Sequence, residues 1–420
     1  MKRGGIVLVL LLIALTNFVV ITIDGVAPLT VFILYFPVVV YFVLIRLKNR
    51  LPVLDNPGVV ILAGYLFFVS LINIGEVRWS SFWYSILFCV FFLFIAQHQY
   101  VFSRERIQKT SKIIIYSYLI NVLLAQILFA FIGGLSSLEW LFQGTLDAKS
   151  GVMRFQGFSS EPSYAAFVVL VAFLVYSRFT KDTRKSKAII LLSVIFLLRS
   201  FSSVYGYIIL SAIGLDWVLR HKKTTKINRI IILFIAILGG GVVGSFGISG
   251  ESRVGGIIFL IASGNLNLES LRFIDGSAFM RVGPLFSYLE EIDWFSMQTY
   301  VGYGAGSAAI HFGSIFNDVI DSSYKGYESS TLNLGFFPAF SYDYGIIGVI
   351  LVFLTVLRRG MCGFISIESF IIILLLFNAN FNTQLFWYVW AMLFIMNNIS
   401  SRTYDIEMRI NSLRFTREVL

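Results

Sequence analysis

Residues 187–219 read KAIILLSVIFLLRSFSSVYGYIILSAIGLDWVL, an apolar stretch interrupted at one place by the run RSFSS at residues 199–203. The stretch is too long for one membrane-spanning helix, which needs about 20 apolar residues. We therefore interpret it as two spans, near 187–200 and 203–219, that meet at the interruption. This pair predicts an integral membrane protein.

The composition of the whole chain agrees with this interpretation. Of its 420 residues, 57% are hydrophobic and only 13% are charged, and the mean hydropathy is +0.83. A soluble domain of this size cannot bury so much apolar surface in one core, whereas a bilayer replaces water as the solvent. The two cysteines, Cys89 and Cys362, lie in or beside apolar runs, which argues against a disulfide framework and against a Cys-based metal site.

Ten further apolar runs complete a prediction of about 12 transmembrane helices in a single all-α polytopic domain, residues 1–420. The first run follows the basic start MKR. Because this run is too long for a signal peptide and no small-x-small cleavage site follows it, we expect it to be a retained span. The predicted spans lie near 5–23, 29–45, 58–74, 80–97, 113–133, 162–178, 187–200, 203–219, 228–246, 334–357, 362–378 and 384–399.

The distribution of Lys and Arg predicts the orientation of these spans, because short cytoplasmic loops are enriched in both residues. With a cytoplasmic N-terminus and alternating sides, the inner segments hold all but eight of the 33 basic residues. Both termini are then cytoplasmic, in a multi-pass protein of the cytoplasmic (inner) membrane. The net charge of +10 is explained as a topology signal, with no nucleic-acid partner. The outer exceptions are Arg78, Lys149, Arg154, Arg199, Arg253, Arg272, Arg281 and Lys325.

Two of the outer segments are long. The first covers residues 134–161, and the second covers residues 247–333 between the ninth and tenth spans. Connections of this length are usually functional or disordered. The second contains apolar stretches such as Ala278–Leu289, so we expect a large, partly helical extracytoplasmic loop packed on the membrane face.

The segment RFQGFSSEPSY, residues 154–164, joins the first outer segment to the sixth span. Gly157 allows a tight backbone, and Pro162 fits the first turn of a helix. Ser160 or Glu161 would cap that helix, where the helix dipole favours a carboxylate. Glu161 is therefore either a plain cap or a functional carboxylate at the outer end of the span.

Three of the outer arginines, Arg154, Arg199 and Arg281, lie close to span ends or on a predicted surface helix. The planar guanidinium of arginine binds phosphate oxygens in a bidentate manner and stays charged in a dry site. An anionic ligand at the outer face would account for all three. A solvated interfacial anchor remains the alternative for Arg154.

The run RFQGFSSEPSYAAF resembles the Arg-x-x-Gly-x-x-x-Glu-Pro signature of Wzy-type O-antigen and exopolysaccharide polymerases, a family related to the O-antigen ligases. Further segments are similar to that family in the same order, and together they cover most of the chain. They are LLRSFSSVYGYIIL at a mid-chain span end, SAFMRVGPLFSYLEEI and VGYGAGSAA in the large outer loop, and LNLGFFPAFSYDYGIIGVILVFL in the next span. Each motif alone is degenerate, and their order and spacing carry the resemblance.

The resemblance implies a GT-C-like architecture and a glycosyltransferase that needs no metal or other cofactor. The substrate would be an oligosaccharide repeat unit on undecaprenyl pyrophosphate. The growing glycan would pass from its lipid pyrophosphate to the non-reducing end of a new lipid-linked unit at the outer face of the membrane. The family also implies a chain-length regulator and a flippase as partners in the synthesis of polysaccharides such as lipopolysaccharide.

Under this interpretation Arg154, Arg199 and Arg281 bind the pyrophosphate, and Arg281 also stabilises the charge that develops as the donor bond breaks. Glu161 is the first candidate for the catalytic base that accepts the proton of the acceptor hydroxyl, and His311 is the second. A lone loop histidine is, however, more often merely solvated. Gly304, in the turn GYGAG at residues 302–306, would bind phosphate through backbone N–H groups, with a flexible hinge as the equal alternative.

Two other functions remain open at this point. An O-antigen ligase-type glycan transferase is kept open by His311, whereas the Glu-Pro form of the first motif favours the polymerase. A polysaccharide flippase or transporter would show two similar halves and ionisable residues at mid-membrane. Neither feature is evident, because most charges lie at span ends and the longest loop is late in the chain.

Overall fold

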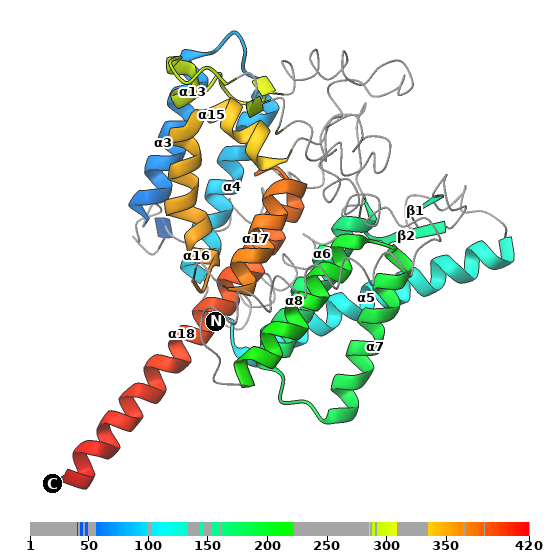
Figure 1. The fold of residues 1–420 in the computed structure, drawn as a ribbon. Helices are drawn as coiled ribbons and strands as arrows, with labels where there is room; N and C mark the ends of the chain where they lie inside the picture. Colours follow the sequence, from blue (N-terminus) through cyan, green and yellow to red (C-terminus); the bar gives the residue numbers. More distant parts are fainter. Residues whose placement is uncertain are drawn as a thin grey trace, which may run out of the picture.

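The computed structural model describes residues 56–98, 102–132, 143–146, 153–159, 161–221, 292–308, 335–363, 366–381 and 383–419, with isolated positions at 40, 43, 44, 47, 48, 285, 288 and 289. This part of the chain is almost entirely helical and contains one two-stranded sheet (Figure 1). The predicted spans near 5–23, 29–45 and 228–246, and most of the large outer loop, lie outside the described residues.

The other nine predicted spans all lie on helices. Among the described residues, four stretches are long and apolar enough to cross a membrane, namely Trp79–Gln97, Arg104–Phe131, Pro162–Phe179 and Phe336–Gly360. The described residues therefore agree with a helical membrane protein, while the number of twelve spans and their sides remain predictions. The nine helices are α3 (Pro57–Ile72), α4 (Trp79–His98), α5 (Arg104–Ile132), α6 (Pro162–Phe179), α7 (Arg184–Phe201), α8 (Val204–His221), α15 (Phe336–Val352), α17 (Ile367–Asn378) and α18 (Gln384–Val419).

The break predicted within residues 199–203 is present as a tight turn between α7 and α8. Ser202 adopts the left-handed conformation, with φ 48° and ψ 45°, and its N–H group bonds to the carbonyl oxygens of Leu198 and Arg199 at 3.0 and 3.2 Å. Such a residue satisfies the last carbonyls of a helix and reverses the chain. The polar interruption in the sequence thus marks the end of one helix and the start of the next.

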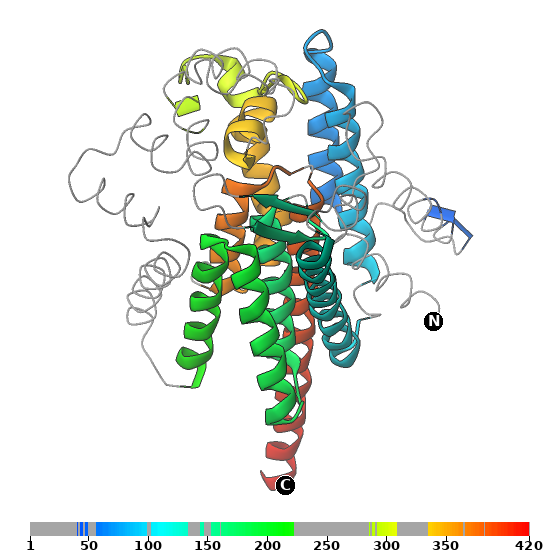
Figure 2. The ribbon, with the colours of Figure 1, turned by 90° about the vertical axis from the view of Figure 1, so that its right-hand side faces the viewer.

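Helix α6 is the centre of one half of the bundle. It is buried along almost its whole length and packs against α5, α7, α8 and α18 (Figure 2). Gly206 lets α8 approach both α7 and α6 closely, since a Cβ atom at this glycine would lie 2.7 Å from Leu198 on α7 and 3.2 Å from Ala166 on α6. The end of α6 that carries Glu161 is therefore positioned by four neighbouring helices.

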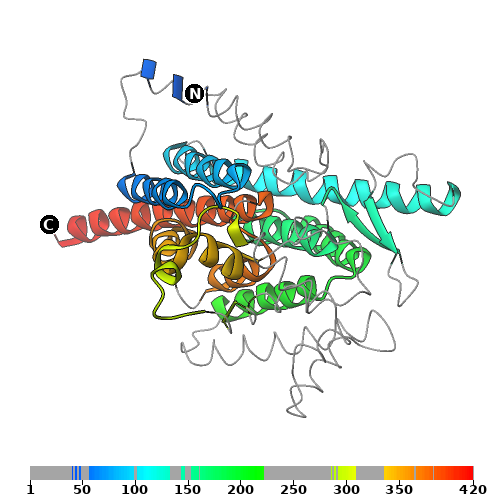
Figure 3. The ribbon, with the colours of Figure 1, turned by 90° about the horizontal axis from the view of Figure 1, so that it is seen from above.

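Aromatic side chains join α4 to α18, which lie side by side (Figure 3). Phe91 stacks on Trp387 with ring centroids 5.6 Å apart, and Phe92 contacts Trp390 at 4.4 Å. The indole N–H of Trp390 donates to the carbonyl oxygen of Val356 at 3.0 Å, within the π-helical turn Phe353–Leu357. The aromatic core therefore also supplies a donor where the regular helix is interrupted.

Helix α15 is broken at Gly345, whose φ of 64° and ψ of −178° are not helical. The break makes room for α13 (Met297–Val301), a short helix from the end of the large outer loop. A Cβ atom at Gly345 would lie 2.2 Å from the carbonyl oxygen of Tyr300. The hydroxyl of Tyr65 on α3 lies 3.0 Å from both Val301 O and Tyr344 O, which share its one hydrogen. One tyrosine thus fastens the loop to two helices.

The first outer segment, for which the sequence predicted no regular structure, contains a β-hairpin. Strand β1 (Gln143–Leu146) pairs antiparallel with β2 (Met153–Gly157), and Thr145 lies opposite Arg154. Strands this short carry little apolar alternation, so no pattern in the sequence predicts them. The hairpin places Arg154 on a paired strand at the ends of α6 and α7 (Figure 1).

At the opposite end of α6, a buried ion-pair group joins three helices. The guanidinium of Arg178 on α6 lies 2.7 Å from Glu368 on α17 and 3.2 Å from Asp216 on α8. The Glu368 side chain is fully buried. A buried carboxylate is tolerated only when its charge is compensated, so Arg178 is required wherever Glu368 is retained.

We predict that Arg178→Ala lowers stability by about 3–5 kcal/mol, because it leaves a buried carboxylate without a counterion. The double variant Arg178→Met/Glu368→Leu should recover part of that loss, since two apolar side chains of similar size replace this pair while Asp216 still loses its bond to Arg178. Thermal unfolding of the purified protein in detergent measures both. Arg184→Ala, at an exposed position, is the control, and an Arg178→Ala protein as stable as this control would contradict the prediction.

Candidate functional site

Arg154 reaches from β2 to the C-terminal end of α7. Its Nε and Nη2 atoms donate to the carbonyl oxygens of Phe201 and Ser202, at 3.3 and 3.1 Å. The last carbonyls of a helix have no partner within the helix, and the helix dipole favours a cation there. The guanidinium therefore caps α7 and fixes the hairpin to the α7–α8 turn.

Arg199 lies in the last turn of α7, three residues before Ser202, and its side chain is exposed. The structure thus brings Arg154 and Arg199, predicted from separate stretches of sequence, to the same end of one helix. Arg154 is half-buried and engaged in protein contacts, whereas Arg199 faces the surroundings. Arg154 therefore has a structural role, whereas the exposed side chain of Arg199 is available to a ligand.

Glu161 occupies the N-cap position of α6, and Pro162 is the first helical residue, as the sequence predicted. The backbone of Glu161 is extended, but its side chain makes no capping bond to the helix N–H groups. Its carboxylate instead accepts a hydrogen bond of 3.1 Å from the hydroxyl of Ser163. The plain cap interpretation is therefore correct for the position of Glu161 but not for its side chain.

The segment between Arg154 and Glu161 wraps around Tyr118 of α5. Gly157 has a φ of 61°, and a Cβ atom there would lie 2.6 Å from the Tyr118 ring. The buried hydroxyl of Tyr118 pairs with the hydroxyl of Ser159 at 2.8 Å. The glycine of the motif is thus explained by close contact with an aromatic ring. Sequence reasoning did not single out Tyr118, because its role depends on a partner far along the chain.

The electrostatics at this end of the bundle favour an anion. Helices α6 and α8 both begin here, and their N-termini carry partial positive charge with N–H groups that point outward. Helix α7 ends here, and its partial negative charge is met by Arg154. Arg154 and Arg199 add two full positive charges, against one carboxylate from Glu161. Within the described residues, this is where the predicted site residues Arg154, Arg199 and Glu161 gather.

The glycine turn lies elsewhere and already holds an anionic group. Gly302, Gly304 and Gly306 all have positive φ, from 77° to 97°. The N–H group of Gly304 donates to the backbone oxygen of Asp343 at 2.8 Å. The carboxylate of Asp343 accepts bonds from the N–H groups of Gly306 and Ala308, at 2.7 and 2.9 Å.

The N–H groups of the turn therefore bind a carboxylate, which is the side chain of Asp343 and not a ligand. A Cβ atom at Gly304 would lie 2.9 Å from Val77 and 3.2 Å from Asn73, beside the α3–α4 turn. Gly304 is thus set apart from the end of α7 that carries Arg154, and in this conformation its N–H group is bonded to Asp343. We leave Gly304 out of the site built from Arg154, Arg199 and Glu161.

Asp343 was not singled out in the sequence, although a signal was present. It is a carboxylate inside the apolar run FFPAFSYDYGIIG, and an ionisable residue at such a position is functional by default. Its observed role is to hold the end of the large outer loop on α15. The hydroxyl of Ser307 adds a third bond to this carboxylate at 3.2 Å.

Arg281 and His311 lie outside the described residues, so their assignments stay predictions. The part of the chain that the structure describes contains no group of three His, Cys, Asp or Glu side chains placed to hold a metal ion. The expectation of a metal-free reaction likewise stays a prediction.

No model of a known protein family and no curated protein matches this chain. The family resemblance therefore rests on the motifs quoted above, and the function that it implies is argued below as a proposal.

We predict that Gly157→Ala lowers stability by at least about 1–3 kcal/mol, because a left-handed backbone is strained for alanine. The clash with Tyr118 adds to this strain. Gly64→Ala in α3 is the matched control, since a Cβ atom there meets nothing within 4 Å. Thermal unfolding in detergent compares the two, and equal stability of both variants would contradict this packing.

We also predict that Asp343→Asn loosens the glycine turn. An amide offers one oxygen in place of two, and its NH₂ group faces N–H donors that need an acceptor. Hydrogen–deuterium exchange across residues 302–308 should become faster in this variant than in the control Glu76→Gln, which changes an exposed carboxylate nearby. Unchanged exchange protection in Asp343→Asn would show that the carboxylate does not hold the turn.

Proposed function

We propose that this chain is a polysaccharide polymerase that transfers a growing glycan from undecaprenyl pyrophosphate to a new lipid-linked repeat unit. The observation that carries the proposal is the gathering of Arg154, Arg199 and Glu161 where α6 begins and α7 ends. These residues come from two of the motifs that resemble the polymerase family, whereas Gly304, from a third motif, lies elsewhere. The site would lie at the outer face of the cytoplasmic membrane, as the charge distribution predicts.

The charge at this end of the bundle suits the donor. When the glycosidic bond to the lipid pyrophosphate breaks, negative charge grows on the departing phosphate oxygen. Fixed cations and helix N-termini stabilise that charge strongly where water is scarce. Arg199 and Arg154 supply the cations from described residues, and Arg281 is expected to complete the set.

The exposed apolar side chains of α7 support a donor with a lipid tail. Leu192 and Ile195 are 65% and 45% exposed, and with Arg199 they follow the spacing that places side chains on one helical face. A stripe of exposed apolar side chains therefore leads to an exposed arginine. A polyprenyl chain lying along this stripe would bring its pyrophosphate to Arg199.

The transfer itself needs one proton acceptor. The acceptor hydroxyl oxygen attacks the anomeric carbon of the donor sugar, the bond from that carbon to the pyrophosphate oxygen breaks, and the bonding electrons leave with the pyrophosphate. The hydroxyl proton passes to a base. Glu161 is our candidate, because its carboxylate is not used to cap α6 and is half-exposed beside the arginines. His311 remains the second candidate.

Substitution of Arg199 tests the proposal most cleanly, because this side chain is exposed. We predict that Arg199→Gln reduces polymer formation by the purified protein from a lipid-linked repeat unit about 10²–10³-fold, the loss typical of one donor to a developing charge. Its melting temperature should stay close to that of the unsubstituted protein. Arg154→Gln should lose both activity and stability, because Arg154 also caps α7.

Arg184→Gln is the matched control, since it removes an exposed arginine from the other end of the same helix. Full activity in Arg199→Gln, equal to that of Arg184→Gln, would remove Arg199 from the site. In cells, loss of a polymerase should leave single repeat units attached to the surface acceptor, whereas loss of a ligase should leave none.

A further inference from the structure

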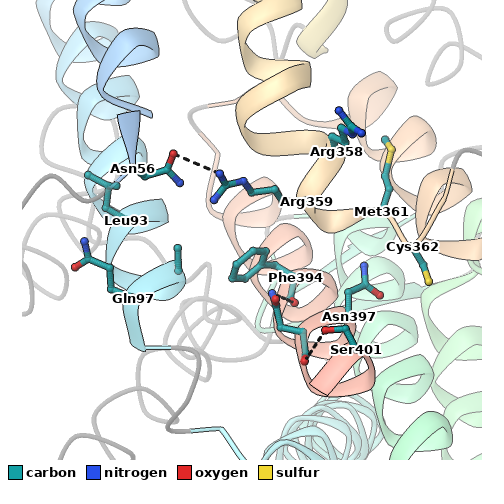
Figure 4. A pocket seen from close by; sticks show the side chains of 12 residues that line it. Asn56, Leu93, Gln97, Arg358, Arg359, Met361, Cys362, Phe394, Asn397 and Ser401 are labelled. Carbon is teal, nitrogen blue, oxygen red and sulfur yellow. Dashed lines mark hydrogen bonds between the residues drawn. The ribbon is translucent and has the colours of Figure 1, made fainter. Parts of the chain in front are cut away.

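A polar pocket lies at the opposite end of the helices from the α3–α4 turn, between the start of α3, the end of α4, the short helix α16 (Arg358–Gly360) and α18 (Figure 4). Its volume is about 630 Å³, within the range of pockets that hold small molecules. By the predicted orientation, this end is cytoplasmic. The pocket is lined by Asn56, Leu93, Ala96, Gln97, Arg358, Arg359, Met361, Cys362, Phe394, Asn397, Asn398 and Ser401.

The lining has the chemistry of an anion site. It contains two arginines, four carboxamide side chains and one hydroxyl, and no carboxylate. In the described part of the chain, neither Arg358 nor Arg359 forms an ion pair. Two guanidinium groups beside apolar helices, without a described counterion, favour an anionic ligand.

Arg359 is the better placed of the two cations. Its side chain extends across the pocket toward Asn56, with which it makes a 3.4 Å contact (Figure 4). Its guanidinium lies 5.7 Å from the centroid of the Phe92 ring, within the reach of a cation–π contact. Arg358 lies on the other wall, near Met361 (Figure 4). A ligand in the pocket would thus meet one oriented guanidinium and a second positive charge at the rim.

The carboxamides mainly build the walls. The NH₂ group of Asn397 donates to Gly360 O at 2.7 Å, and that of Asn398 donates to Phe394 O at 2.8 Å. The first bond holds α16 against α18, and the second lies within α18, so the guanidinium groups remain the main donors to a ligand. Leu93 and Phe394 add apolar surface beside the cations. The pocket therefore suits an anion that is attached to an apolar body.

We propose that this pocket binds a phosphate-bearing anion, and that its source is the head group of an anionic phospholipid in the leaflet at this end. Basic pockets between membrane helices are typical binding places for such head groups. A soluble phosphate compound shares the chemistry, and the experiment below separates the two sources. The inference does not depend on the proposed polymerase activity.

A cysteine that lines the pocket allows binding to be measured by chemical labelling. Cys362 is exposed and lines the pocket, whereas Cys89 is buried and only 2% exposed. An uncharged maleimide should therefore label Cys362, and a bound phospholipid should slow that labelling. Cys362→Ser, which removes the thiol, measures any labelling elsewhere.

The experiment uses the full chain, purified and reconstituted in vesicles of phosphatidylcholine, with or without phosphatidylglycerol. We expect phosphatidylglycerol to slow labelling of Cys362 about tenfold, and Arg358→Gln/Arg359→Gln to abolish this slowing. Arg184→Gln/Lys185→Gln removes the same charge from the same predicted face and should keep the slowing. Arg359→Gln alone replaces the double variant if the latter does not fold.

Inorganic phosphate, added to the protein in phosphatidylcholine vesicles, is the second arm. Slowing by phosphatidylglycerol alone supports the lipid as the source, and slowing by millimolar inorganic phosphate supports the anion site but assigns it to a soluble compound. Native mass spectrometry should show a phosphatidylglycerol molecule retained by the unsubstituted protein and lost from the double variant. The proposal would be overturned if neither phosphatidylglycerol nor inorganic phosphate slowed the labelling of Cys362. It would also be overturned if the slowing persisted in Arg358→Gln/Arg359→Gln.

Discussion

The hydrogen bonds from Arg154 to the carbonyl oxygens of Phe201 and Ser202 are the contact on which the candidate site depends. They join the β-hairpin to the α7–α8 turn and bring a cation to the end of the helix that carries Arg199. The same segment places Glu161 at the start of α6 after wrapping around Tyr118, which requires Gly157. Arg154 therefore both holds the hairpin on α7 and belongs to the candidate site.

The irregular parts of the bundle follow one rule, which is that a backbone or carboxylate group removed from water must find a partner within the protein. The break at Gly345 is satisfied by Tyr65, and the π-helical turn in the same stretch of chain receives the indole of Trp390. The carboxylate of Asp343 occupies the glycine turn, and Arg178 compensates the buried Glu368. These contacts fasten the loops to the helices, so that both ends of the bundle present defined polar surfaces.

The helices could be predicted from the sequence because apolar length and basic flanks are local signals. The α7–α8 break and the start of α6 at Pro162 were predicted for the same reason. The hairpin, Tyr118 and the partnership of Asp343 with the glycine turn were not, since each depends on residues far apart in the chain. Gly304 was interpreted as a phosphate-binding residue, but the glycine turn binds Asp343 instead. A glycine-rich turn in a sequence indicates an anion, and the sequence alone does not tell whether that anion is a ligand or a side chain. Arg281 and His311 lie outside the described residues and keep their predicted roles.

We propose that the site of Arg154, Arg199 and Glu161 forms glycosidic bonds and releases a lipid pyrophosphate. The most direct measurement supplies the purified protein, in vesicles, with a single defined lipid-linked repeat unit and follows both the glycan length and the released lipid. The account predicts a ladder of longer glycans and one free polyprenyl pyrophosphate for each new bond. Passage of the repeat unit across the bilayer with no new glycosidic bond and no released pyrophosphate would contradict it and favour a transporter.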